Sequence, residues 1–217
     1  MKKTYVWDWG VRGFHWLLVL SLLGSYLTAE QGWLSMDWHF RFGYLALGLI
    51  CFRVIWGFIG NEHARFADFL RGPAAVFAYV RGLFARDHQR SLGHSALGGW
   101  ASMVLLLAVA LQASTGLMTT DDIFMEGPLA KHVSTDTVSL MTRIHAININ
   151  VIYGLVALHL SAMAFYLFGK RENLITAMLS GKKSAVEGKD ADSTRWGRLI
   201  LAAAVAASLV GGLVWLA

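Results

Sequence analysis

Four of the eight histidines in this sequence lie at or inside long apolar stretches: His15, His39, His145 and His159. An ionisable side chain at membrane depth is costly, so each of them is a candidate for function. His145 and His159 are 14 residues apart, which is about four helical turns, so they would lie on nearly the same face of a helix. They would be separated by about 21 Å along the axis. The spacing therefore predicts two sites at two depths.

Each of these two histidines has a predicted partner on another helix. If consecutive helices cross the membrane in alternating directions, His15 shares the depth of His159, and His39 shares the depth of His145. Two facing imidazoles are the axial ligands of a six-coordinate haem iron, and a helix bundle supplies a flat apolar slot. Zinc would need further ligands at each depth, and a proton relay usually includes carboxylates inside the membrane. We therefore predict two haems, with a histidine-lined transporter or metal carrier as the alternative.

Three arginines accompany the predicted haem sites. Arg53 interrupts an apolar stretch, where a guanidinium needs a negative partner. A haem propionate would serve, and extension of the side chain to the lipid headgroups is the alternative. Arg12 flanks His15 and Arg41 flanks His39, and both are further candidates for propionate binding.

The stretches that carry these residues have the length of membrane-spanning helices. Of the 217 residues, 56% are hydrophobic and only 15% are charged, against about a quarter charged in an ordinary soluble domain. A membrane-spanning helix needs about 20 apolar residues, and five stretches come close to or exceed this length: 13–29, 42–60, 91–120, 144–169 and 199–217. The sequence thus predicts an all-α integral membrane protein. We expect a four-helix transmembrane bundle that holds two b haems, plus a fifth C-terminal transmembrane helix.

The segments between these stretches alternate in charge. Residues 1–12, 61–90 and 170–198 contain 15 of the 19 Lys and Arg and have a net charge of +7, whereas residues 30–41 and 121–143 have a net charge of −3. Basic loops face the cytoplasm, so we predict a multi-pass protein of the bacterial inner membrane with a cytoplasmic N-terminus and a periplasmic C-terminus. The net charge of +5 is then no sign of nucleic-acid binding. A cleaved secretory signal at the N-terminus is an alternative that the four further spans oppose.

The remaining segments are assigned to the membrane surface. The basic segment 61–90 is expected to include an amphipathic helix after Pro73, in contact with lipid headgroups, or else to be a solvated loop. Three further histidines lie in loops and are expected to be solvated: His63, His88 and His132. The predicted organisation is a di-haem domain over residues 1–180, a flexible cytoplasmic linker over 181–195 and a transmembrane helix over 196–217.

Several short motifs together resemble a known family. The segment Arg12-Gly13-Phe14-His15-Trp16 resembles the RxxHW signature of bacterial di-haem b-type cytochromes. This group includes prokaryotic cytochrome b561 and the membrane cytochrome subunits of nickel–iron hydrogenases. Residues 53–57 and 92–100 are also typical, although the family more often has Asn-Pro where Ser95-Ala96 stand here. The similarity covers residues 5–180. The motifs are specific for the family when taken together, whereas each motif alone is weak.

The resemblance implies a function in respiratory electron transfer. It supports the pairs His15 with His159 and His39 with His145 as haem ligands. It also implies electron exchange between the membrane quinone pool and a partner, either a periplasmic c-type cytochrome or a hydrogenase-like subunit, with superoxide oxidation as a further variant. The family's quinone site beside the inner haem points to His94 and Ser95 in this sequence; a helix start in the headgroup region is the other interpretation. The acidic outer segments favour a basic c-type cytochrome as partner.

Overall fold

Long helices dominate the computed structural model, which describes residues 3–83, 91–121, 125–184, 190–191 and 193–216. Five helices occupy the five apolar stretches predicted from the sequence: α1 (Trp9–Ala29), α2 (Met36–Ile59), α5 (Ala96–Gly116), α6 (Thr135–Ala164) and α8 (Trp196–Leu216). A π-helical turn (Phe165–Gly169) follows α6. The prediction of an all-α membrane protein is therefore confirmed.

Within the described residues, four of these helices are long and apolar enough to cross a membrane. They are α2, α5, α6 together with its π-helical turn, and α8. Helix α1 is 21 residues long but less apolar, because it includes Arg12 and His15 near its start. The helix itself is present where it was predicted, and the polar residues that lower its apolarity are the ones proposed above to bind haem.

The chain divides into two compact units, and each long helix contributes one end to each unit. The first unit comprises Met1–Gly13, Arg53–Val104 and Ala157–Ala202, and the second comprises Phe14–Phe52, Leu105–Val156 and Ala203–Ala217. We describe each unit by itself.

Four helices pack around one apolar core in the second unit. Its buried centre consists of Ala46 and Ile50 from α2, Ala108 and Val109 from α5, and Ile152 from α6. Leucines of α1 pack against this centre. Small side chains let helices approach closely, and polar bonds join them: the Ser21 hydroxyl of α1 donates to the carbonyl of Phe42 on α2 at 2.7 Å.

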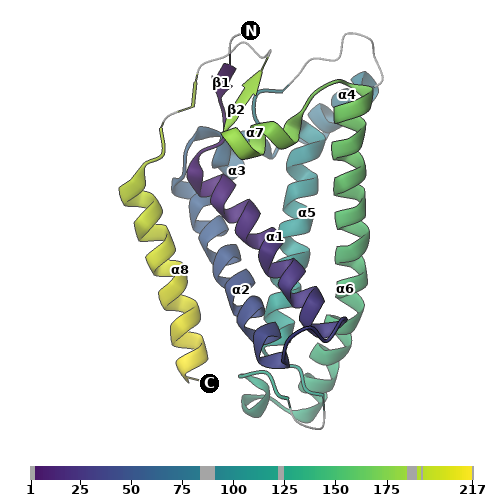
Figure 1. Ribbon diagram of the computed structural model, residues 1–217, viewed down its shortest axis with the longest axis vertical. Helices are drawn as coiled ribbons and strands as arrows, with labels where there is room; N and C mark the ends of the chain where they lie inside the picture. The colour runs from purple at the N-terminus through teal and green to yellow at the C-terminus, as the bar shows by residue number, and fades with distance from the viewer. Residues whose placement is uncertain (1–2, 84–90, 122–124, 185–189, 192, 217) are drawn as a thin grey trace. The chain divides into compact units, whose positions relative to one another are not determined.

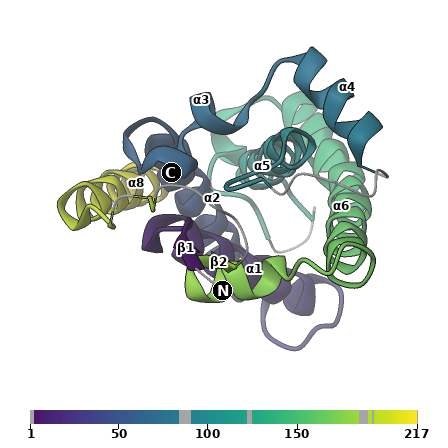
Figure 2. The same ribbon diagram turned by 90° about the horizontal axis from the view of Figure 1, so that it is seen from above.

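A two-stranded sheet and a short helix lie side by side in the first unit (Figures 1 and 2). Strands β1 (Lys3–Tyr5) and β2 (Lys182–Ser184) are antiparallel, with Thr4 opposite Lys183. Helix α7 (Leu174–Ser180) ends at Gly181, which has a φ of 77°, a left-handed conformation that suits glycine. The segment 181–195, predicted as a flexible linker, therefore begins with an ordered strand.

The remaining described elements of the first unit are short helices. They are a 3₁₀ turn (Glu62–Ala64), α3 (Phe66–Phe69) and α4 (Pro73–Gly82). Helix α4 begins at Pro73, which suits the first helical position because proline has no N–H to leave unbonded. The helix predicted after Pro73 is therefore present. A further 3₁₀ turn, Ala130–His132, belongs to the second unit.

Candidate functional site

The structure brings two of the predicted histidines together in the second unit. The ring centroids of His39 on α2 and His145 on α6 are 6.4 Å apart, with an angle of 77° between the ring planes. Both side chains are half-buried. This is the pair expected at one depth of the membrane, although its role as a haem-ligand pair is not tested by the geometry alone.

Both rings are held in the same way, through Nδ1. The Nδ1 of His145 lies 3.0 Å from the carbonyl oxygen of Gln112 and 3.2 Å from the hydroxyl of Thr115. The Nδ1 of His39 lies 3.2 Å from the carbonyl oxygen of Ser25 and 3.5 Å from the hydroxyl of Thr28. A carbonyl oxygen only accepts hydrogen bonds, so the proton of each neutral ring lies on Nδ1. Each Nε2 therefore keeps its lone pair for a metal.

The arrangement fits an axial pair of haem ligands. The two rings come from different helices with 6.4 Å between their centroids, so they would be the two protein ligands of a haem iron if a haem binds here. Gly116 lies against His145, and a Cβ at this position would come within 3.0 Å of the ring. Among the described residues, no group of three or more His, Cys, Asp or Glu is placed to hold a metal ion. A haem iron needs only two protein ligands, since its other four come from the macrocycle.

The second predicted pair is divided between the two units. His15 belongs to the second unit and its ring contacts Trp16, with centroids 4.9 Å apart. His159 belongs to the first unit and is half-buried on α6. Their pairing therefore stays a prediction.

The three arginines have different surroundings. Arg53 is buried, lies over the rings of Phe66 and Phe69, and its Nη1 has no hydrogen-bond partner within the described part of the chain. Such an atom suits a carboxylate ligand, so the propionate prediction stands for Arg53. Arg12 donates instead to the carbonyls of Met178 and Leu179 at the end of α7.

Arg41 packs over the ring of Trp38 in the second unit. The guanidinium carbon is 4.8 Å from the ring centroid, and the side chain is exposed. Neither this contact nor the carbonyl contacts of Arg12 test propionate binding, which stays a prediction for both residues.

Asp8 is a buried carboxylate at the start of α1. It accepts hydrogen bonds from the backbone N–H of Val11 at 2.8 Å and from the indole N–H of Trp56 at 3.2 Å. Burial raises the pKa of Asp8, and these hydrogen bonds and the charge of Arg53 offset part of that effect. Asp8 thus caps α1 and provides a negative charge near Arg53. Sequence reasoning missed it, although an aspartate before an apolar helix is a recognisable N-cap.

His94 is clamped between aromatic rings just before α5. Its ring centroid is 4.7 Å from that of Trp7 and 4.6 Å from that of Phe69. Burial lowers the pKa of His94 to about 3, and the positive charges of Arg53, Lys183 and His63 add to this. The imidazole is therefore neutral at physiological pH and is able to donate or accept a hydrogen bond without changing its charge.

An open cleft of about 520 Å³ in the first unit is lined by His94 together with His63, Asp68, Arg71 and Tyr79. This volume is in the range of small-molecule sites. His94 was predicted to contact a quinone, and its place in the cleft is compatible with that role. Ser95 is not part of the lining: its hydroxyl accepts from the N–H of Gly98 at 3.0 Å and so caps α5.

The outcome for the three loop histidines differs. His63 was expected to be solvated, and this is wrong: it is 8% exposed, and its Nδ1 is 3.1 Å from a carboxylate oxygen of Asp68. The spacing of five residues between the two could have suggested the contact. His132 is exposed, as expected. His88 lies outside the described residues.

Comparison with known proteins identifies the family. Residues 6–181 match the family model described as prokaryotic cytochrome b561. No curated protein and no solved structure gives a significant match to the chain. The matched segment includes every histidine and arginine singled out above for haem binding, and it ends before α8. The chain therefore belongs to the prokaryotic cytochrome b561 family of all-α membrane b-type cytochromes.

Proposed function

We propose that the protein transfers electrons across the bacterial inner membrane through two b haems, from quinol on the cytoplasmic side to a periplasmic c-type cytochrome. The N-terminus would be cytoplasmic and the C-terminus periplasmic, because the basic segments alternate with acidic ones along the chain.

The observation that carries the proposal is the pair of His39 and His145. Two rings from different helices lie with their centroids 6.4 Å apart and their planes at 77°, and each donates its Nδ1–H to a backbone carbonyl. A hydrogen bond from Nδ1–H to a carbonyl is typical of metal-binding histidines, because it holds the ring in place and makes Nε2 more basic. A histidine that serves only for packing has no need of a partner ring at this distance.

In the proposed arrangement, His39 and His145 hold one haem and His15 and His159 hold the other. Haem iron supplies reversible one-electron chemistry when bound. The chain's own residues provide the ligands, and the buried guanidinium of Arg53 provides a positive partner for a propionate. The apolar core of the second unit joins the helices α2 and α6, which contribute the first pair.

The cleft beside His94 is the proposed quinol site. The acidic outer segments, with a net charge of −3, would attract a basic c-type cytochrome and repel an anion such as superoxide. A hydrogenase-like partner that passes electrons to quinone would use the same internal residues, so it is distinguished by the protein that copurifies from native membranes.

The first experiment tests haem binding and ligand pairing. We expect the purified protein to show reduced b-type absorption bands after dithionite and two haems per chain. H39A and H145A should lose the same haem, and H15A and H159A the other, whereas H132A, an exposed histidine, should lose none. Absence of the bands would leave the histidine-lined transporter as the better explanation. Loss of one shared haem by all four variants would contradict the pairing.

The second experiment tests direction. The haems should be reduced by a soluble quinol analogue in an anaerobic stopped-flow measurement and then reoxidised by a basic c-type cytochrome. If the analogue reduces no haem while dithionite reduces both, the quinol assignment is wrong.

A further inference from the structure

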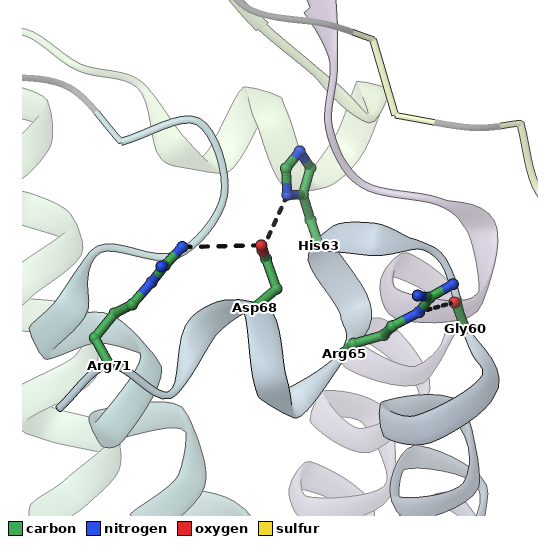
Figure 3. Close-up of polar contacts among 5 residues, drawn as sticks. All are labelled: Gly60, His63, Arg65, Asp68 and Arg71. Carbon is green, nitrogen blue, oxygen red and sulfur yellow. Dashed lines mark hydrogen bonds and ion pairs between the residues drawn. The ribbon is translucent and has the colours of Figure 1, made fainter.

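Three side chains at one edge of the cleft form a hydrogen-bonded and ion-paired cluster (Figure 3). His63 Nδ1 is 3.1 Å from one oxygen of Asp68, and Arg71 Nη2 is 3.8 Å from the other. The Nε of Arg65 donates to the carbonyl of Gly60 at 2.9 Å and so fixes the turn that presents His63. The family resemblance gave no role to any of these residues.

The contact with Asp68 determines which nitrogen of His63 carries the proton. A carboxylate accepts hydrogen bonds, so the neutral ring carries its proton on Nδ1 and has a lone pair on Nε2. The same contact holds the ring in one orientation. His63 therefore has the tautomer of a general base, with its ring held in place.

His94, the other histidine of the cleft, has the opposite environment. Among the described residues no carboxylate pairs with it, Trp7 and Phe69 lie against it, and the charges that act on it are positive. Its pKa of about 3 means that it takes no proton at neutral pH. One cleft thus contains a histidine that is suited to accept a proton and one that is suited to stay neutral.

We propose that His63, paired with Asp68, accepts the protons released when quinol is oxidised in this cleft, while His94 holds the ligand by a neutral hydrogen bond. This rests on the proposed function and adds the proton acceptor to it. The charged and titratable side chains that line the cleft with His63 are Asp68, Arg71, Tyr79 and His94.

The proposed step balances in electrons and protons. Each quinol loses two electrons and two protons, and the electrons would leave singly to the proposed c-type acceptor through the haems that the histidine pairs would hold. As each O–H bond breaks, an N–H bond forms at His63 Nε2, and the proton then passes to water before the next arrives. The products are one quinone, two protons and two reduced acceptors.

The neighbours of His63 are more exposed than its ring. The side chain of His63 is 10% exposed, that of Asp68 is 26% exposed and that of Arg71 is 58% exposed. The ring is therefore buried next to side chains that solvent reaches.

The test uses the full-length, haem-loaded protein and a soluble ubiquinol analogue under anaerobic conditions. We expect H63Q and H63A to reduce the rate of haem reduction by quinol about 100-fold, in the range typical of general-base loss. Haem content and reduction by dithionite should be unchanged. D68N should slow the reaction less, because the ring remains. The matched control is H132A, which removes an exposed histidine and should react at the wild-type rate.

Two further readouts separate a proton acceptor from a structural residue. Added imidazole should restore part of the rate of H63A as its concentration rises, with the haem spectrum recorded to exclude ligation, and should not accelerate H132A. Quenching of tryptophan fluorescence by the oxidised quinone should give a similar dissociation constant for H63Q and wild type, and a weaker one for H94F, since Trp7 lies against His94.

The outcomes distinguish the two proposals. If quinol does not reduce the wild-type haems, the proposed function fails. If quinol reduces wild type and H63Q at the same rate, or if imidazole leaves H63A unchanged, the role of His63 is wrong and the proposed function stands. If H63A loses its haem, D68N and H63Q provide the test.

Discussion

Thr115→Val tests whether the residues behind His145 tune a haem. The Thr115 hydroxyl donates its own hydrogen to the carbonyls of Leu111 at 2.8 Å and Gln112 at 3.1 Å. Toward His145 Nδ1, 3.2 Å away, it therefore acts as an acceptor. Valine keeps the branched shape of the side chain and removes the oxygen, so the contact with His145 is lost together with the bonds of the hydroxyl to the two carbonyls.

The expected change in haem potential depends on the two hydrogen-bond acceptors next to His145 Nδ1–H, the Thr115 hydroxyl and the Gln112 carbonyl. A hydrogen bond contributes about 1 kcal/mol, and for a one-electron couple this corresponds to about 40 mV. The carbonyl of Gln112 at 3.0 Å remains as an acceptor, so the hydrogen-bond energy at Nδ1 is lost only in part. When the Nδ1–H of a histidine ligand loses a hydrogen-bond acceptor, the imidazole becomes less basic and stabilises ferric iron less. We therefore expect the potential of one haem to rise by about 20 to 40 mV.

Redox titration of the reduced-minus-oxidised absorbance measures this shift. Thr28→Val should shift the same haem by less, because its contact with His39 is longer at 3.5 Å. Thr119→Val is the matched control, since its hydroxyl donates to the carbonyl of Gly116, and it should shift neither potential. A shift of the other haem in T115V, or an equal shift in T119V, would refute the reasoning.

Three further predictions concern stability in detergent. In the native state His94 takes up a proton only below a pH of about 3. In the unfolded chain it takes up a proton below a pH of about 6.5. Stability should therefore fall as the pH falls from 6.5 toward 3, by up to about 1.4 kcal/mol per pH unit from this residue, and H94F should show a smaller loss of Tm between pH 7.5 and 4.5. Arg12→Ala removes the bonds to the end of α7 and should lower the Tm measured by tryptophan fluorescence; a Tm equal to wild type would argue against an anchoring role. Gly24→Ala places a Cβ 2.5 Å from the Phe42 ring and should cost about 1 to 3 kcal/mol, whereas Gly43→Ala meets nothing within 4 Å and should be close to neutral.

The positions of the long helices could be predicted from the sequence because they depend on local composition. Apolar stretches of sufficient length form helices in a bilayer whatever their neighbours are. The contact between His39 and His145 could also be predicted, because consecutive helices cross the membrane in alternating directions and this places the two residues at one depth. The depth of a residue in the membrane depends on its position along its helix, and the helical rise of 1.5 Å per residue converts that position into a distance.

The missed features depend on contacts between distant segments. Lys183 pairs with Thr4 in the small sheet and also lies 2.8 Å from Glu172, and nothing in the composition of residues 181–195 indicates a strand. The burial of His63 likewise depends on the turn between α2 and α3 and on its carboxylate partner. A loop position favours exposure on average, but a charged neighbour five residues away changes that expectation.

The hydrogen bond at Nδ1 distinguishes the roles of the histidines more clearly than their depth does. His39 and His145 donate to backbone carbonyls, which orient a ring without adding a full charge and so suit a metal ligand. His63 faces a carboxylate, which keeps the proton of the neutral ring on Nδ1, leaves a lone pair on Nε2 and so suits a base. The Nδ1 of His94 has no hydrogen-bond partner within the described residues, and aromatic rings enclose it, so its neutral form is favoured. One residue type thus supports ligation, proton acceptance and neutral hydrogen bonding because its partner at a single nitrogen differs.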